Sequence, residues 1–250
     1  MGELPYTEPV SDRPHLPVLP EQVSEHLAQP TAKRFLDGTV GAGGHSRLIL
    51  EALPEAQLVA LDRDPGSLAL ARETLAPFGE RVRLIRSAFA DAPETASEHG
   101  PFDGILLDLG ISSMQVDQPE RGFSFKSDGP LDMRMDPDGE TTARDLVEQL
   151  GEEDLANVIF ELGEERHSRR IARAIVAARR EGPIATTSQL ADIVRRAMPH
   201  RGGKSKNKVK RRRRPIDPAT RTFQALRLAV NDELGQLDRA LPGMWSLLAP

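Results

Sequence analysis

The chain contains no cysteine among its 250 residues. Disulfide bonds, zinc sites with thiolate ligands and cysteine nucleophiles are therefore all excluded. Aromatic residues are also scarce, at 4% of the chain, whereas hydrophobic residues reach 38% and charged residues 28%. This length and composition predict one large domain or a domain that carries a second, smaller one.

Long apolar runs are missing as well, because no stretch of about 18 apolar residues occurs. The first residues include Glu3, Pro5 and Glu8, where a signal peptide would have a basic and then an apolar segment. Gly2 would suit myristoylation, but Tyr6 stands where that signal needs serine or threonine. We therefore expect a cytoplasmic protein with no lipid anchor and no membrane partner.

Positive charge is concentrated in one segment. The net charge is −5, yet nine cations and no acid lie between Arg201 and Arg214, which leaves −14 on the rest of the chain. Such a block, with Gly202 and Gly203 inside it, cannot bury itself, and we expect a mobile loop. Two roles remain open for this basic block: a solvated charge run, or an arm that contacts phosphate groups.

Short apolar runs alternate with helical stretches through the first half of the chain. Three of these runs stop at a carboxylate, namely Asp37, Asp62 and Asp108. The predicted strands lie at 35–36, 58–61, 82–85 and 105–107, with helices at 46–52 and 66–75 between them. This rhythm predicts an α/β fold with a Rossmann-like, doubly wound parallel sheet. The three carboxylates should then face one crevice beyond the carboxyl ends of the strands.

A helical insert is expected after the fourth strand. Leu155, Val158, Ile159 and Leu162 have helical spacing, as do Leu190, Ile193, Val194 and Ala197, where Thr186 and Gln189 form a capping box. One long helix should begin after Asp217-Pro218 and bury a stripe from Phe223 to Leu241. We therefore expect an all-helical insert at 116–216, carrying the basic block, within a sheet domain at 1–115 and 217–250.

A glycine-rich loop follows the first strand, from Asp37 to Ser46. Glycine there allows a ligand to approach the backbone closely, at the point where a helix begins. A dinucleotide fingerprint would need a third glycine at position 46, which is serine, so nicotinamide binding is disfavoured. Asp62 ends the next strand, at the spacing where an acid binds ribose hydroxyls.

Several longer strings together identify a family resemblance that spans about His15 to Pro250. The strings are DGTVGAGGHS (37–46), LDRD (61–64), ILLDLGISS (105–113), RGFSF (121–125), DGPLDMRMD (128–136) and ATRTFQALR (219–227). In these strings the chain resembles the bacterial 16S rRNA (cytosine-N4) methyltransferases, which depend on S-adenosylmethionine.

The resemblance implies a cofactor, a substrate and a set of cofactor contacts. The cofactor is S-adenosyl-L-methionine, and the partner is 16S rRNA in the small ribosomal subunit, methylated on a cytosine of the decoding region (cytosine 1402 in the numbering of that RNA). Gly43 and Gly44 suit the methionine portion of the cofactor, Asp62 its ribose and Phe89 a face of the adenine. The other implied contacts are His45, Asp108 and Gln115, and His45 could alternatively be an ordinary helix-terminus residue.

An exocyclic amine carries its own lone pair and needs no covalent intermediate, whereas methylation of cytosine C5 typically uses a cysteine that this chain lacks. The protein must align the amine and exclude water. Amine-modifying methyltransferases often carry an Asp/Asn-Pro-Pro-aromatic string after the fourth strand, where this chain has Asp108-Leu109-Gly110-Ile111. Asp108 is the first candidate to orient the amine or receive its proton.

Two further groups are candidates for RNA contact. Phe123 and Phe125 lie in a glycine-rich loop and are candidates to stack a flipped cytosine, so that the catalytic set is Asp108, Phe123 and Phe125. Alternatively, the two rings form a hydrophobic plug between the sheet domain and the insert. Asp132, Arg134 and Asp136 either orient RNA or pair with one another. No metal site is expected.

Two rival functions remain open: a methyltransferase of another small-molecule or protein substrate, and a non-catalytic RNA-binding assembly factor. The oligomeric state, including a homodimer, is also open. The resembling family continues beyond Pro250 with further strands, so we expect a truncated version of a longer enzyme whose fourth strand lacks a neighbour.

Overall fold

The computed structural model describes residues 17–199 and 216–250, and it divides into two compact units. The sheet unit comprises the described residues up to Leu109 together with Ala240–Pro250, and the helical unit comprises Gly110–Arg239. The basic block and the start of the chain lie outside the described residues. None of the helices in the described ranges has both the length and the apolar character that crossing a bilayer requires.

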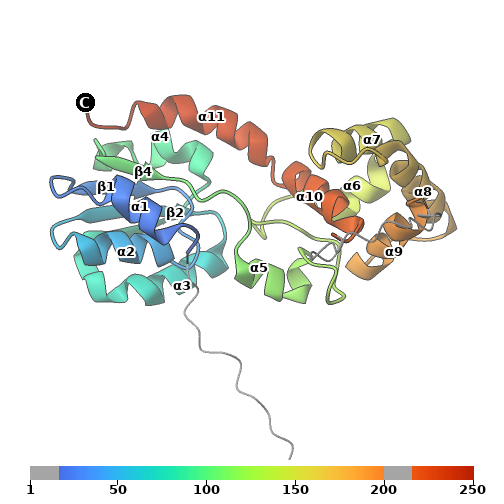
Figure 1. Ribbon diagram of the computed structural model, residues 1–250, viewed down its shortest axis with the longest axis horizontal. Coiled ribbons are helices and arrows are strands. Elements are labelled where there is room, and N and C mark those ends of the chain that lie inside the picture. Colours follow the sequence, from blue (N-terminus) through green and yellow to red (C-terminus); the bar gives the residue numbers. More distant parts are fainter. Residues whose placement is uncertain (1–16, 200–215) are drawn as a thin grey trace, which may run out of the picture. The chain divides into compact units, whose positions relative to one another are not determined.

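Four parallel strands form the centre of the sheet unit (Figure 1). They are β1 (Arg34–Asp37), β2 (Gln57–Asp62), β3 (Val82–Arg86) and β4 (Gly104–Leu106), in the order β3-β2-β1-β4. In register, Leu36 pairs with Val59 on one side and with Ile105 on the other. The strand order reverses direction at β1, so the ends of β1 and β4 flank a topological switch point. The α/β prediction of a doubly wound parallel sheet is confirmed.

Helices cover both faces of this sheet because successive residues of each strand point to opposite sides. Phe35 and Leu58 face one side, where they pack with Ile49 and other apolar residues of α1 (Pro20–Leu27), α2 (Gly44–Ala52) and α3 (Pro65–Leu75). Leu36 faces the other side, in a cluster with Ala92 of α4 (Ala92–Thr95) and with Ala240 and Met244 of α11 (Glu233–Trp245). Short 3-10 helices lie at Ala76–Arg81 (η1), Phe89–Asp91 (η2) and Ser97–His99 (η3).

β4 lies at the edge of the sheet and pairs with β1. Just before β4, Phe102 forms a parallel bridge with Leu248: its N–H donates to Leu247 O and its carbonyl accepts from Ala249 N, both at 2.8 Å. Among the described residues this bridge is the only backbone pairing on the outer side of this edge. Most of the β4 edge is therefore unpaired within this part of the chain.

The helical unit consists of short helices around a core of its own. Its elements are α5 (Ser113–Asp117), η4 (Pro119–Arg121), α6 (Ala143–Gln149), α7 (Glu152–Glu161), α8 (Ser168–Glu181), α9 (Thr187–Ala197) and α10 (Ala219–Val230). Leu155 and Ile159 of α7 and Leu190 and Val194 of α9 are buried in this core, as their spacing predicts. The capping box between Thr186 and Gln189 is present.

The prediction of one long C-terminal helix is wrong. α10 ends at Val230 and α11 begins at Glu233, with Asp232 between them in a left-handed conformation at φ 46°. The break has a tertiary cause, since the buried Asn231 side chain accepts from Met135 N at 2.8 Å and donates to Met133 O at 2.7 Å.

The unit boundaries also differ from the expected ones at 116 and 216. Residues 217–239 belong to the helical unit because Phe223 and Leu226 of α10 are buried in its core. The sheet unit keeps only the last part of α11, and the helical unit begins at Gly110.

Candidate cofactor site at the carboxyl end of the sheet

The loop between β1 and α2 depends on glycines at two positions. Gly41 and Gly43 have φ values of 53° and 86°, in the left-handed region that favours glycine. A Cβ on Gly43 would also lie 3.2 Å from the Leu75 side chain. The loop is closed by the hydrogen bond from Gly43 N to Val40 O at 2.7 Å, and α2 begins at the next residue. A larger residue at Gly43 would therefore be both strained in its backbone and crowded by Leu75.

Asp37 holds the base of this loop. Its carboxylate accepts from Ser46 Oγ at 2.6 Å and from Thr39 N at 3.1 Å, and the residue is 2% exposed. Burial raises the pKa of Asp37 to about 6. The expectation that Asp37 faces an open crevice is wrong, because the carboxylate is buried and already bonded on both oxygens.

Asp62 ties two loops together at the end of β2. Its two carboxylate oxygens accept from Gly41 N and Asp64 N, each at 2.9 Å. Burial raises the pKa of Asp62, and these two backbone hydrogen bonds act in the opposite direction. Since a carboxylate has about four acceptor positions, two bonds leave capacity for a ligand hydroxyl.

His45 and Asp108 lie next to each other beside the glycine loop. The Asp108 backbone N–H donates to Thr39 Oγ1 at 2.7 Å, and Asp108 Oδ2 lies 3.6 Å from His45 Nε2. The Asp108 side chain is 45% exposed, whereas that of His45 is 8% exposed. Burial lowers the pKa of His45, and the Asp108 charge partly opposes this. Among the described residues His45 Nδ1 is buried and has no hydrogen-bond partner, so it can pair with a polar group of a ligand.

The remaining expected cofactor residues lie in different units. Phe89 is partly buried at the start of η2, and a Cβ placed on Gly38 would lie 3.2 Å from its Cβ, so the ring belongs to the same end of the sheet. Gln115 lies in α5 of the helical unit, where its side chain completes the capping box with Ser112. Six of the seven expected cofactor residues are therefore in the sheet unit.

The two loop aromatics of the helical unit are packed. Phe123 is 8% exposed and lies in the core, with the Arg121 guanidinium 5.8 Å from its ring centre. Phe125 makes an edge contact with Phe223 at 4.8 Å between ring centres and has Arg195 5.5 Å from its ring centre. All of these contacts lie within the helical unit, where they anchor the loop. The plug between domain and insert and the base-stacking role both stay predictions.

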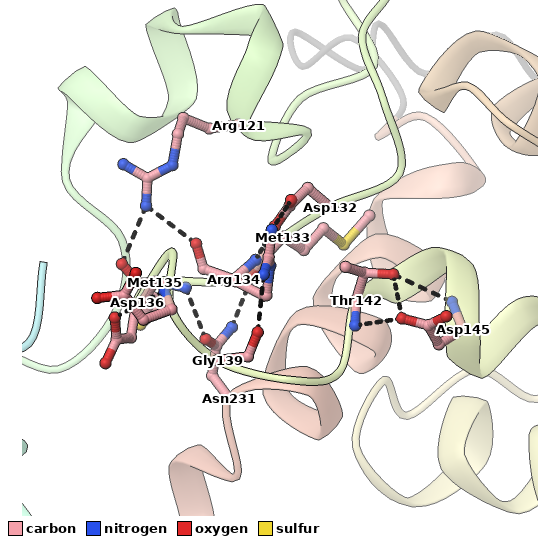
Figure 2. Close-up of polar contacts among 11 residues, drawn as sticks. Arg121, Asp132, Met133, Arg134, Met135, Asp136, Gly139, Thr142, Asp145 and Asn231 are labelled. Atoms are coloured by element: carbon pink, nitrogen blue, oxygen red, sulfur yellow. Dashed lines mark hydrogen bonds and ion pairs between the residues drawn. The ribbon is translucent and has the colours of Figure 1, made fainter.

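Figure 2 shows the polar contacts within the loop between η4 and α6. Arg134 forms a bidentate ion pair with Asp132, at 2.7 and 2.9 Å, and Arg121 donates to the carbonyls of Arg134 and Met135. Met133 lies in the left-handed region at φ 64° and is fully buried. The Asp132–Arg134 pairing matches the alternative in which these charges bind one another.

Asn231 is the residue that sequence reasoning missed here. It appears in Figure 2 because its side chain bonds to the backbone of Met133 and Met135. Asparagine after the last helical residue is a local signal for a helix end, but its bonds to Met133 and Met135 could not be predicted, since these partners lie 96 and 98 residues earlier in the chain. Thr39 and Ser46, by contrast, lie within the glycine-rich string, where their hydroxyls could have been considered as loop-closing groups.

A match to a protein family covers almost the whole chain. The model of the MraW methylase family matches residues 12–250. The chain belongs to this family. Two relatives are each named "Ribosomal RNA small subunit methyltransferase H". The protein from Gluconobacter oxydans (strain 621H) is 51% identical over 94% of this chain and 69% of its own length. The one from Geobacter sulfurreducens (strain ATCC 51573 / DSM 12127 / PCA) is 50% identical over 94% of this chain and 74% of its own length.

Proposed function

We propose that this chain transfers a methyl group from S-adenosyl-L-methionine to the exocyclic N4 amine of a cytosine in the decoding region of 16S ribosomal RNA. The observation that carries the proposal is the group formed by Asp62, His45 and Asp108 around the glycine loop, in a member of the MraW methylase family. The printed names of the relatives support ribosomal RNA of the small subunit as the substrate class.

The residues at the end of the sheet fit this cofactor. The unpartnered, buried Nδ1 of His45 is available to a polar group of the ligand, and Gly43 and Gly44 allow the methionine portion close to the backbone. Asp62 has free acceptor capacity for the ribose hydroxyls. Phe89 offers an apolar face for the adenine, and Gln115 is the further contact that the resemblance implies. Once bound, the cofactor supplies an electrophilic methyl group on a sulfonium.

Asp108 is the residue we assign to the amine. Its carboxylate is nearly half exposed, and its backbone is fixed by the Thr39 hydroxyl, so Oδ1 and Oδ2 can accept hydrogen bonds from the two N–H groups of an exocyclic amine. The same carboxylate can take the proton that the amine must lose. Burial lowers the pKa of His45, so its ring is neutral at physiological pH. His45 therefore does not neutralise the negative charge with which Asp108 would bind the amine.

We assign recognition of the RNA to the helical unit. Phe123 and Phe125 are the candidates to stack on the cytosine, and the basic block, which lies outside the described residues, is the candidate phosphate contact. The partner is 16S rRNA within the small ribosomal subunit.

The test uses cofactor labelled in its methyl group and offers the chain three acceptor pools: small-subunit RNA, total protein and small metabolites. The proposal predicts label in RNA alone. Label in protein or metabolites would support the small-molecule or protein methyltransferase alternative. RNA binding without transfer would support a non-catalytic assembly factor.

A further inference from the structure

The solvent face of α8 carries a line of arginines. Arg169, Arg170, Arg173 and Arg180 are all exposed and form what we call the arginine stripe. At 100° per residue, the four positions fall within an arc of about 100° on the helix. The stripe extends over about 16 Å along the helix axis, because Arg169 and Arg180 are eleven residues apart and each residue adds about 1.5 Å.

The rest of α8 gives the stripe little compensating charge. The helix contains five arginines and a single acid, Glu181, so its net charge is +4, whereas the whole chain carries −5. Arg173 pairs with Glu152 of α7 at 3.3 Å. In contrast, Arg169, Arg170 and Arg180 have no ion pair or hydrogen bond with any residue in the described ranges.

The position of two of these arginines is unfavourable for the helix itself. Arg169 and Arg170 lie in the first turn, which contains no acid, and the N-cap residue His167 makes no side-chain cap. Cations at this end oppose the helix macrodipole, which favours negative charge there. The helix is instead stabilised by its buried face, including Ile171 and Ile175, which are 0% exposed. An anion bound at the stripe would meet both the guanidinium groups and the positive end of the helix.

We propose that the arginine stripe is a docking surface for the phosphodiester backbone of the RNA substrate, an inference that rests on the proposed function. Guanidinium groups bind phosphate oxygens in a bidentate manner. An RNA strand presents a repeated series of such phosphates, which a linear array of cations can follow. A membrane surface fits less well, because an interfacial helix needs an exposed apolar face and the apolar face of α8 is buried in the core.

The experiment measures RNA binding as a function of salt, by fluorescence anisotropy with a 16S rRNA fragment that contains the decoding region. The stripe variant is R169Q/R170Q/R180Q. The matched control, R47Q/R72Q/R83Q, removes the same charge from exposed arginines of the sheet unit. The variant R169K/R170K/R180K keeps the charge. All four proteins, wild type included, carry the same basic block.

Loss of three phosphate contacts should reduce the slope of log K against log salt by about 2 to 3 in the stripe variant. The control and the lysine variant should keep slopes close to that of the wild type. In methylation assays the stripe variant should show a raised KM for RNA with kcat unchanged, as expected when only ground-state binding is lost. Affinity for S-adenosylmethionine should be unchanged, because none of Arg169, Arg170 and Arg180 is among the expected cofactor residues.

An unchanged slope in the stripe variant, or an equal reduction in the control, would overturn the proposal. So would binding to phosphatidylserine vesicles that depends on the stripe while RNA binding does not. If the triple variant does not fold, R180Q alone in the last turn should lower the slope by about 0.7 to 0.9, and no change would refute the inference. RNA binding can be measured without methyl transfer, so the two proposals can fail separately. If only the proposed methylation is wrong, the salt slopes will differ between variants as predicted while no methyl group is transferred to RNA.

Discussion

Replacing Asp62 by alanine tests the cofactor site most sharply within the sheet unit. The substitution removes two backbone hydrogen bonds, from Gly41 N and Asp64 N at 2.9 Å, as well as any bond to the ribose. A hydrogen bond to a charged acceptor contributes about 1.5 to 3 kcal/mol, so loss of one ribose bond should weaken cofactor binding about 10- to 150-fold. Calorimetric titration with S-adenosylmethionine measures this directly.

The structure supplies a control for the structural part of this loss. Asp103 also accepts two backbone N–H groups, from Lys33 at 2.7 Å and Arg34 at 2.9 Å, but at the amino end of β1. We expect Asp62→Ala and Asp103→Ala both to lower the free energy of unfolding by about 1 to 3 kcal/mol. Only Asp62→Ala should weaken cofactor binding. Equal cofactor affinity in wild type and Asp62→Ala, or an equal loss in Asp103→Ala, would refute the assignment.

Predictions for four further substitutions concern stability and the loop aromatics. Burial raises the pKa of Asp37 from 3.8 to about 6, so the folded chain binds the Asp37 proton more tightly than the unfolded chain does. The stability that this proton contributes is lost as pH rises from about 4 to 6, and urea titrations should show Asp37→Asn gaining up to about 3 kcal/mol relative to wild type over that window. A difference between the two proteins that does not change with pH would contradict the shift. Asn231→Ala should lower the free energy of unfolding by about 2 to 5 kcal/mol, because two buried backbone groups lose their hydrogen-bond partner. A loss below about 1 kcal/mol in the same titration would mean that water replaces the side chain. Phe123→Ala should lower the free energy of unfolding by about 3 to 5 kcal/mol and leave cofactor affinity unchanged. If Phe125 stacks on the cytosine, Phe125→Leu should lower RNA methylation about 5- to 150-fold with little loss of stability. Full methylation activity in Phe125→Leu would leave Phe125 as a loop anchor.

The sheet could be predicted from the sequence because its signals are local. Short apolar runs such as 58–61 end at a carboxylate, and the glycines of the 38–44 loop mark the place where the chain must turn with positive φ. The observed β2 ends at Asp62, the residue expected. The parallel topology then follows from the alternation of strands and helices.

The parts that were predicted less well depend on contacts between distant residues. The apolar stripe after Asp217 continues beyond Asn231, so its spacing predicts one helix, whereas the Asn231 side chain bonds to Arg227 O within α10 and to the backbone of Met133 and Met135. Similarly, the burial of Phe123 and the contact between Phe125 and Phe223 depend on tertiary packing that spacing alone cannot give. Asp37 looked equivalent to Asp62 in sequence, but the Ser46 hydroxyl and burial make it a structural group.

The central claim is tested most directly by identifying the methylated base. Small-subunit RNA is incubated with the chain and methyl-labelled S-adenosylmethionine, then digested, and the labelled nucleoside and its position are determined by mass spectrometry. The account predicts N4-methylcytosine at one cytosine of the decoding region, with the rate strongly reduced by Asp62→Ala. Label on a cytosine carbon or on another base, or an unchanged rate in Asp62→Ala, would contradict it.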